Sequence, residues 1–319
     1  MIASSFKTRL LPVLATTAAI ALLAGCASGP TAESDAGDGR TVDTVLGEVT
    51  VPTEIDSVVV LEGRRDLDIV LSLGLPLIGY PYEEAGSLDL ESPTAAALAE
   101  SSASELFLAD EINLEAIAEA APSLIVSRVD DVEPILDELQ AIAPVLAIGE
   151  QSVSTWQEDL RLVAEATGTE ARAEELISEY DARIAEVAAE YADVLANNTF
   201  APVGIDAEGS QTRPNRLLSS VLRDLGATPS DAFAESIEIN DGVEYGPEQL
   251  LNAFGDADAI VALVNDPAEW ESVQADALYK QLPAVISGHV VRSDKQTHEG
   301  GALTAMHSID VIEALLQTF

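Results

Sequence analysis

A helical stretch with almost no helix-breaking residues, from Glu170 to about Ala196, constrains the fold of this 319-residue chain more than any other feature. A helix of that length would be roughly 40 Å long at 1.5 Å per residue, which is enough to cross a whole domain. Leu176, Ile184 and Val187 give it one apolar stripe, whereas its acids and arginines favour a solvated face. We therefore expect this helix to bridge two separately folded regions.

Short apolar runs alternate with helical patterns on both sides of this bridge. Before it, strands are expected at 57–61, 76–79, 124–127 and 145–148, and helices at 66–73, 113–121, 132–142 and 156–167. After it, strands are expected at 203–206, 259–264 and 290–292, and helices at 215–225, 247–254 and 303–316. Such alternation indicates parallel sheets of the α/β class. We predict two α/β lobes, each a mostly parallel sheet flanked by helices, joined by one long interdomain helix.

The beginning of the chain has the layout of an export signal. Lys7 and Arg9 give a short cationic region before an apolar run at 10–23, and two small residues then precede Cys26. The apolar run has about 14 residues, whereas a membrane-spanning helix needs about 20. A cleaved signal at 1–25 is therefore expected in place of a transmembrane anchor.

Cys26 is the only cysteine, so disulfides, zinc–thiolate sites and cysteine catalysis are excluded for the folded part of the chain. Its placement resembles the lipobox of bacterial lipoproteins. The resemblance implies a diacylglycerol on the Cys26 sulfur, with acyl chains that hold the mature protein to a membrane face.

These features divide the chain into five parts. They are the signal at 1–25, a flexible tether at 26–40, the N-terminal lobe at 41–150, the bridging region at 151–198 and the C-terminal lobe at 199–319. About 280 residues follow the tether, which is enough for two domains with sizeable cores.

Acidic residues greatly outnumber basic ones. The chain has 56 Asp and Glu against 15 Lys and Arg, which gives a formal net charge of −41. Phosphate binding requires a basic surface, so this balance excludes nucleic acid as a partner. We interpret the acidity as an adaptation of the surface to solubility or high salt.

The few cations concentrate after predicted strands. Ligands of open parallel sheets collect beyond the carboxyl ends of the strands. Five arginines fall in such places: Arg64, Arg65, Arg128, Arg213 and Arg216. We expect them to gather in one cleft, where their planar groups would bind the oxygens of an anionic ligand. The alternative for each arginine is an ion pair with one of the many acids.

Four other side chains are candidates for the same cleft. Tyr82, Tyr245 and Trp270 could supply flat apolar walls with polar tips, and His298 lies in the loop before the closing helix. All three histidines fall in the second lobe, and no cysteine accompanies them. We therefore predict no metal site made by the protein.

Five segments carry a resemblance to a known family. They are NLEAIAEAAPSLIVSR at 113–128, LDELQAIAPVLAI at 136–148, WQEDLRLVAEATGTEARAEELISEYDARI at 156–184, YGPEQLL at 245–251 and LPAVISGHVV at 282–291. With the lipobox in front, the chain resembles the iron-siderophore and cobalamin class of ABC-importer substrate-binding proteins, from about Val42 to Phe319.

That resemblance implies a rigid pair of lobes that clamp a ferric siderophore and deliver it to an ABC importer permease dimer with its ATPase. It implies a monomer anchored by lipid on the outer face of the cytoplasmic membrane or the periplasmic side. No intrinsic cofactor is expected, because an iron chelate brings its own donor atoms. A haem or cobalamin receptor of the same fold is the alternative, although neither ligand needs five cations.

Glu115 and Glu248 occupy equivalent places, each in the first turn of a predicted helix. In the family, such glutamates engage arginines of the permease, so the match implies docking by these two residues. A carboxylate at a helix start is favoured by the macrodipole and can pair bidentately with arginine. The alternative is that each glutamate only stabilises its helix, by about 0.3–1 kcal/mol.

An enzyme, for instance a surface hydrolase, is the rival class. The segment Gly209-Ser210-Gln211 does not make a nucleophile elbow, and the sequence has no glycine-rich phosphate loop. We therefore expect a binding protein without catalytic residues.

Overall fold

The computed structural model describes residues 39–150 and 153–319. Cys26, the signal predicted at 1–25 and most of the tether predicted at 26–40 lie outside these residues. The first strand begins at Gly39, two residues before the predicted start of the N-terminal lobe. The five-part division of the chain stays a prediction.

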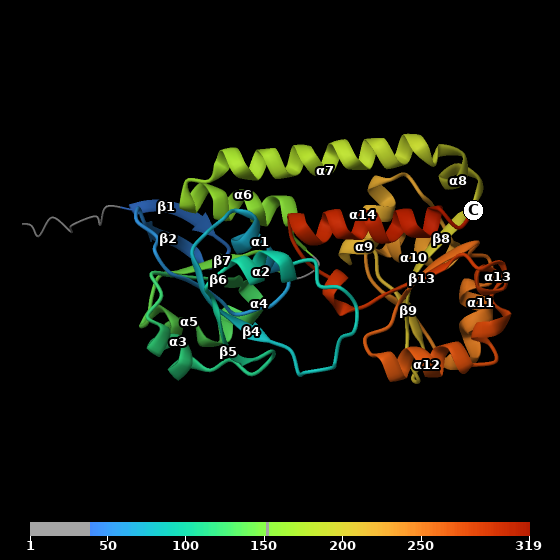
Figure 1. The fold of residues 1–319 in the computed structure, drawn as a ribbon, viewed down its shortest axis with the longest axis horizontal. Helices are drawn as coiled ribbons and strands as arrows, with labels where there is room; N and C mark the ends of the chain where they lie inside the picture. The colour runs from blue at the N-terminus through green and yellow to red at the C-terminus, as the bar shows by residue number, and fades with distance from the viewer. Residues whose placement is uncertain (1–38, 151–152) are drawn as a thin grey trace, which may run out of the picture. The chain divides into compact units, whose positions relative to one another are not determined.

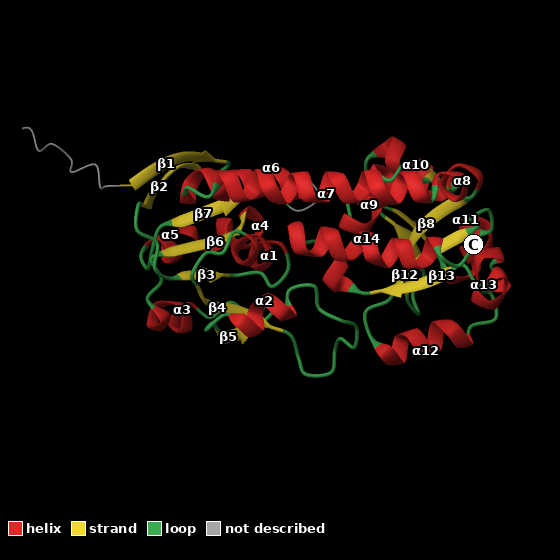
Figure 2. Cartoon of the chain, turned by 45° about the horizontal axis from the view of Figure 1, so that its top comes forward, coloured by secondary structure: helices red, strands yellow, loops and turns green. Residues whose placement is uncertain are grey.

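The N-terminal lobe contains a five-stranded parallel sheet in the order β5-β4-β3-β6-β7 (Figures 1 and 2). Its strands are β3 (Val58–Val60), β4 (Leu77–Tyr82), β5 (Ser104–Leu108), β6 (Leu124–Arg128) and β7 (Val145–Ile148). Its helices are α1 (Arg65–Ser72), α2 (Ala95–Glu100), α3 (Leu114–Ala120), α4 (Val129–Val132) and α5 (Leu136–Gln140). Every residue of β6 and β7 is buried, as expected for parallel strands covered on both faces.

This lobe differs from the sequence prediction in several places, and neither β5 nor α2 was predicted. An antiparallel hairpin, β1 (Gly39–Thr44) with β2 (Gly47–Pro52), precedes the sheet and was not predicted. The helix predicted at 132–142 is divided into α4, a 3₁₀ turn at Glu133–Ile135 and α5. Pro134 explains the division, because proline lacks the N–H that a continuous helix would need there.

The C-terminal lobe contains a six-stranded mixed sheet. Its main order is β11-β9-β8-β12-β13, and β10 also pairs with β8. The strands are β8 (Thr199–Ile205), β9 (Ser210–Thr212), β10 (Thr228–Pro229), β11 (Val243–Tyr245), β12 (Ala259–Leu263) and β13 (Val290–Ser293). The pairs that involve β9 are antiparallel and the others are parallel.

The helices of this lobe are α9 (Leu217–Asp224), α10 (Asp231–Ile239), α11 (Leu250–Phe254), α12 (Pro267–Ala275), α13 (Pro283–Ser287) and α14 (Ala302–Leu316). Three 3₁₀ turns accompany them, at Pro247–Gln249, Tyr279–Gln281 and Lys295–Thr297. The helix predicted at 247–254 is therefore a 3₁₀ turn followed by a short α-helix.

Three helices form the bridge: α6 (Trp156–Thr167), α7 (Glu170–Glu190) and α8 (Ala192–Asn197). The start of α6 is fixed by a capping box, in which Thr155 Oγ1 accepts from the Glu158 N–H at 3.2 Å and Glu158 accepts from the Thr155 N–H at 2.8 Å. The single helix predicted to about Ala196 ends at Glu190, because Tyr191 leaves the helical conformation with φ −105° and ψ 23°.

One hydrophobic cluster runs through both lobes and the bridge. It includes Val60 and Ile69 of the first lobe, Val187 of α7, and Leu218 and Ile309 of the second. Figures 1 and 2 show α7 and α14 running alongside each other, and α14 also contacts α1 and α9. Two smaller clusters lie in the individual lobes. The predicted fold class, with two α/β lobes and a long linking helix, is confirmed.

None of the helices in the described part of the chain combines the length and the apolar character that crossing a bilayer requires.

Candidate ligand-binding site

The loops after β3, β6 and β13 bring cations of both lobes together. Arg64 follows β3, Arg128 ends β6 and Lys295 follows β13. Arg216 joins them as the residue immediately before α9, in extended backbone. The predicted gathering of arginines beyond strand ends therefore occurs for part of the set.

Glu299 links two of these arginines. Its Oε2 accepts from Nη1 of Arg128, and its Oε1 accepts from Nη1 of Arg216 at 3.0 Å. The Glu299 side chain is 2% exposed and that of Arg128 is 6% exposed. Arg128 belongs to the first lobe and Glu299 to the second, so a buried ion pair joins the lobes. Asp131 also pairs with Arg128, at 3.2 Å.

Arg64 is held by Glu62. Their side chains form an ion pair of 2.5 Å, and Glu62 Oε2 also accepts from the backbone N–H groups of Arg64 and Arg65, each at 2.8 Å. Although burial alone would raise it, the charges of Arg64 and Arg128 lower the pKa of Glu62. Glu62 therefore stays ionised and fixes the loop that presents Arg64.

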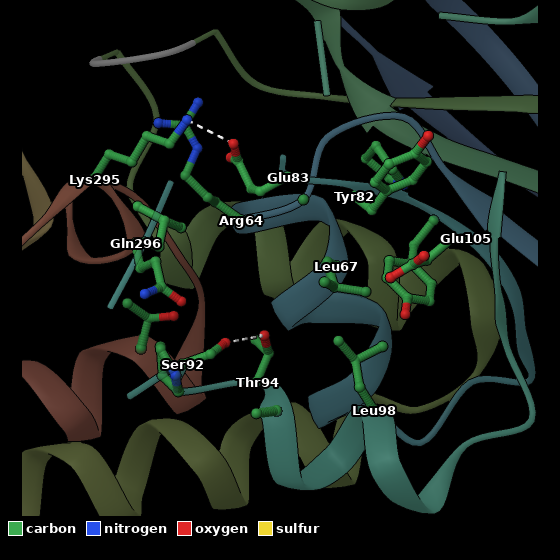
Figure 3. A pocket seen from close by; sticks show the side chains of 17 residues that line it. Arg64, Leu67, Tyr82, Glu83, Ser92, Thr94, Leu98, Glu105, Lys295 and Gln296 are labelled. Atoms are coloured by element: carbon green, nitrogen blue, oxygen red, sulfur yellow. Dashed lines mark hydrogen bonds and ion pairs between the residues drawn. The ribbon is translucent and has the colours of Figure 1, made fainter. Parts of the chain in front are cut away.

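A cavity of about 270 Å³ adjoins this cluster. Its wall combines Arg64 and the aromatic side chains of Tyr80 and Tyr82 with apolar residues of α1 and α2, and Lys295 and Gln296 complete it from the second lobe. Figure 3 shows Lys295 and Gln296 across the pocket from Tyr82 and Glu105. The pocket thus has an apolar floor and charged groups from both lobes.

The loop at 83–94, which follows β4, reaches the second lobe beside this pocket. Glu83 pairs with Lys295 at 2.7 Å, and Asp89 pairs bidentately with Arg292 at 2.8 and 2.9 Å. Gln296 Nε2 also donates to the Leu90 carbonyl at 3.3 Å. The pocket is therefore closed on this side by polar contacts between the lobes, of which the Lys295–Glu83 pair is partly exposed on both sides.

His298 lies among these cations. Burial and the nearby positive charges of Arg216 and Arg64 lower the pKa of His298 to about 3, so its imidazole is neutral at neutral pH. Its Nε2 is buried without a hydrogen-bond partner among the described residues. Burial and the neighbouring arginines also lower the pKa of Arg216, while Glu299 acts in the opposite direction.

Arg65 has a structural role, which differs from the predicted one. Its Nη1 pairs with Asp159 of α6 at 2.7 Å and donates to the Ser154 carbonyl at 3.1 Å, with only 6% of its side chain exposed. Arg65, the first residue of α1, points to α6, whereas Arg64, the N-cap residue outside the helical conformation, lines the pocket. We therefore leave Arg65 out of the candidate site.

Of the nine predicted residues, Arg64 and Tyr82 line the pocket, whereas Arg128, Arg216 and His298 lie in the group of cations beside it. Three more also lie outside the pocket. Arg213 is at the end of β9, where it pairs with Glu244 at 2.6 Å and donates to Gln211 at 2.7 Å. Tyr245 packs edge-on against Phe254 and Trp270 packs edge-on against Tyr279, both against the core of the second lobe. Their aromatic faces are used for packing within that lobe.

Three contributors were missed by the sequence prediction: Lys295, Gln296 and Glu299. Lys295 follows a predicted strand, so the rule that selected the arginines would also have selected it. Glu299 is one of 56 acids, and no local pattern distinguishes it. Its partnership with two arginines becomes visible only in three dimensions.

A larger cavity, of about 620 Å³, lies within the second lobe. Its acidic lining residues are Asp206, Glu248, Glu269 and Asp276, and no cationic side chain among the described residues lines it. None of the nine predicted ligand-binding residues lines this cavity. In the described ranges, 39–150 and 153–319, no three His, Cys, Asp or Glu side chains are grouped to hold a metal ion.

The two docking candidates are both exposed. Glu115 lies in the first turn of α3, whose N-cap Asn113 accepts from the N–H groups of Glu115 and Ala116, each at 3.1 Å. Glu248 lies in the 3₁₀ turn before α11, not in the first turn of a continuous helix. Neither carboxylate forms an ion pair with another described residue.

Known proteins are similar to this chain in sequence and in fold. The chain is 25% identical to the probable siderophore-binding lipoprotein YfiY of Bacillus subtilis, over 92% of this chain and 94% of the relative. It is 27% identical to the ferric enterobactin-binding periplasmic protein FepB of Escherichia coli, over 64% and 67% of the two chains. The structure of Staphylococcus aureus SirA complexed with staphyloferrin B superposes with a TM-score of 0.71 at 20% identity, covering 88% and 98%.

A family model described as periplasmic binding protein matches residues 78–297. That span includes most of the parallel sheet of the first lobe, the whole bridge, and the second sheet through β13. The family consists of binding proteins, which confirms the expectation that the chain is not an enzyme. Because the match covers most of the chain, the protein belongs to the periplasmic binding protein family.

Proposed function

We propose that this protein captures a ferric siderophore between its two lobes and delivers it to the permease dimer of an ABC importer, which works with its ATPase. The observation that carries the proposal is the meeting of Arg64 and Arg128 of one lobe with Arg216 and Lys295 of the other beside a partly aromatic pocket. The names of the relatives, which include siderophore-binding and ferric enterobactin-binding proteins, support it.

The size of the pocket bears on how the ligand enters. Ligand pockets commonly measure about 300–1,000 Å³, so a pocket of about 270 Å³ is small for a bulky chelate. The 83–94 loop is held to the second lobe by ion pairs and one hydrogen bond, and such contacts exchange readily with water or ligand groups. We infer that this loop moves away from Arg292, Lys295 and Gln296 when the chelate enters.

The binding experiment is a titration of purified protein with ferric tris-hydroxamate, ferric tris-catecholate, ferric citrate, haem and cobalamin, followed by intrinsic fluorescence. We expect saturable binding of at least one ferric chelate without turnover. Arg64→Ala should weaken that binding about tenfold, which corresponds to about 1.4 kcal/mol. Arg161→Ala is the matched control, because Arg161 pairs with Glu174 at an exposed site of the bridge. Tight haem or cobalamin binding without chelate binding would contradict the proposal.

We also propose that Cys26 carries the lipid anchor and holds the protein on the outer face of the cytoplasmic membrane or the periplasmic side. The words lipoprotein and periplasmic in the names of relatives support this location. Cys26→Ser should move the protein from the membrane fraction to the soluble extracytoplasmic fraction. Retention of the variant in the membrane fraction would refute anchoring through this thiol.

Glu115 and Glu248 are the proposed contacts with arginines of the permease, and the protein is proposed to act as a monomer. Their exposure and lack of ion-pair partners among the described residues support docking. The double variant Glu115→Lys, Glu248→Lys should abolish uptake of the radiolabelled chelate while leaving its affinity unchanged. Normal uptake by that variant would rule out the docking role, and Glu119→Lys, on the same helix, is the control.

A further inference from the structure

Glu299 is an acid held in place by its surroundings. The carbonyl of His298, the preceding residue, accepts from the Leu217 N–H at 2.9 Å. The following two glycines are tightly packed: a Cβ on Gly300 would approach Thr304 Cβ to 2.3 Å, and one on Gly301 would approach Asp68 Oδ1 to 2.8 Å. The backbone that presents Glu299 is therefore fixed by contacts with α9, α14 and α1.

The Glu299 carboxylate serves as counter-ion to two arginines at once. Arg128 has a second acidic partner, Asp131, whereas Glu299 is the only ion-pair partner of Arg216 among the described residues. A ligand oxygen that bound these two guanidinium groups would have to share them with a fixed carboxylate or displace it. Like charges placed side by side repel strongly where water is excluded.

We call the pocket and the group of cations beside it the cleft. The other cations of the cleft are also paired with acidic side chains. Arg64 pairs with Glu62 and Lys295 pairs with Glu83. His298 adds no charge at neutral pH, as described above. The cleft therefore offers many hydrogen-bond donors without a net positive charge, which removes the electrostatic reason to expect a strongly anionic ligand.

We propose that Glu299 sets the charge selectivity of the cleft: by neutralising Arg128 and Arg216 it makes the site favour ferric chelates of little net charge over strongly anionic ones. Three hydroxamate groups balance the charge of Fe³⁺, whereas three catecholates leave a trianionic complex. The preferred ligand class is thus the neutral tris-hydroxamate. This inference rests on the proposed capture of a ferric siderophore and specifies its ligand.

The test compares dissociation constants for a neutral ferric tris-hydroxamate and a ferric tris-catecholate, measured by isothermal titration calorimetry at low ionic strength. The unmodified protein should bind the tris-hydroxamate at least about tenfold more tightly. Glu299→Gln keeps the shape and removes the charge, so tris-catecholate affinity should rise about tenfold or more, with tris-hydroxamate affinity changed by less than about threefold. High salt should reduce the difference between the two proteins.

Two further variants serve as a control and as a second removal of negative charge near Arg128. Glu244→Gln removes one charge from the more exposed pair with Arg213 and should leave the ratio of the two constants within about twofold. Asp131→Asn neutralises the less buried partner of Arg128 and should shift the ratio in the direction of Glu299→Gln, by a smaller factor. If thermal melting shows that Glu299→Gln does not fold, Asp131→Asn serves as the charge-removing variant in its place.

The outcomes distinguish a failure of charge selection by Glu299 from a failure of siderophore capture. Tighter binding of the tris-catecholate by the unmodified protein, or an unchanged ratio in a folded charge-removing variant, overturns charge selection by Glu299 and leaves siderophore capture standing. Binding of neither chelate, nor of ferric citrate, overturns siderophore capture itself and the inference with it.

Discussion

The two lobes touch on two sides, and the chemistry of these contacts differs. On the side of α7, apolar residues of both lobes and of the bridge belong to one buried cluster. On the side of the pocket, the lobes meet through ion pairs and a hydrogen bond, namely Arg128 with Glu299, Arg292 with Asp89, Lys295 with Glu83, and Gln296 with Leu90. Opening the α7 side would expose apolar surface, whereas the partly exposed Lys295–Glu83 pair on the pocket side can be exchanged for ligand or water. The buried Arg128–Glu299 pair stays fixed.

The α7 side is also tied by specific polar contacts. Tyr180 of α7 donates to Asp224 of α9 at 2.6 Å, and Arg183 of α7 pairs with Glu313 of α14. Asp68 of α1 reaches into the second lobe and caps the start of α14. The α7 side therefore carries the apolar and capping contacts that stabilise the molecule, while the pocket side is the proposed site of binding.

The largest expected effect comes from breaking the cap on α14. The fully buried Asp68 accepts from the Leu303 N–H at 3.0 Å, the Thr304 N–H at 2.8 Å and the Thr304 hydroxyl at 2.6 Å. Asp68→Ala leaves these donors unsatisfied in the interior and should lower the free energy of unfolding by about 2–4 kcal/mol. Urea denaturation measures the loss.

Ser308→Ala is the control for this variant. Ser308 is also buried on α14, but its hydroxyl donates only to the Thr304 carbonyl of the same helix. Its loss should cost about 1 kcal/mol or less. If Asp68→Ala were no more destabilising than Ser308→Ala, the contribution of the α7 side to the free energy of unfolding would not depend on the cap that Asp68 places on α14.

An intermediate effect on stability is expected from Asp66. It lies on α1, the helix that also carries Asp68, beside the charged cluster. Burial, and then the negative charge of Glu62, raise the pKa of Asp66 well above its ordinary value of 3.8. The folded state therefore holds a proton that the unfolded state releases. The stabilisation is complete below pH 3.8 and is lost as the pH rises towards the raised pKa.

Asp66→Asn removes this titration, so the variant should gain stability relative to the unmodified protein as the pH rises above about 4. The gain should reach about 1.4 kcal/mol for each unit by which the pKa is raised. Unfolding free energies of both proteins between pH 4 and 8 measure it. A constant difference across that range would show that Asp66 is ionised in the folded protein.

The smallest effect on stability is expected at the rim of the pocket. Lys295 and Glu83 are partly exposed, so Lys295→Gln should change the free energy of unfolding by less than about 1 kcal/mol. The same variant should weaken ligand binding several-fold, because Lys295 lines the pocket. Lys280→Gln, at an exposed site of the second lobe, should change neither quantity. A large loss of stability in Lys295→Gln would contradict the contrast between the two sides.

Much of the fold could be predicted because periodicity is local. The bounds predicted for β7 and α6 match the structure, and the two parallel cores follow from runs of aliphatic residues. The strands β9 and β11 were missed because three residues are too few to show alternation. The end of α7 at Glu190 was also missed, because no proline or glycine marks it.

The candidate site was predictable only in part. Placement after the parallel strands β3 and β6 correctly brought Arg64 and Arg128 to one edge of a sheet, because the carboxyl ends of parallel strands meet there. Arg216 follows the antiparallel β9 of the other sheet and joins them through Glu299. The same rule could not separate Arg64 from Arg65, whose side chains point in different directions. It also gave no information on which acids would neutralise the arginines.

The sequence by itself determined that two α/β lobes are joined by a long helix, since helix and strand periods and strand-end positions are properties of neighbouring residues. Only the tertiary structure decided the charge of the cleft. Glu299 lies 171 residues from Arg128 and 83 from Arg216, and it meets both because α14 packs against α1 of the first lobe and against α9. Electrostatic pairing depends on distance in space, which separation along the chain does not reveal.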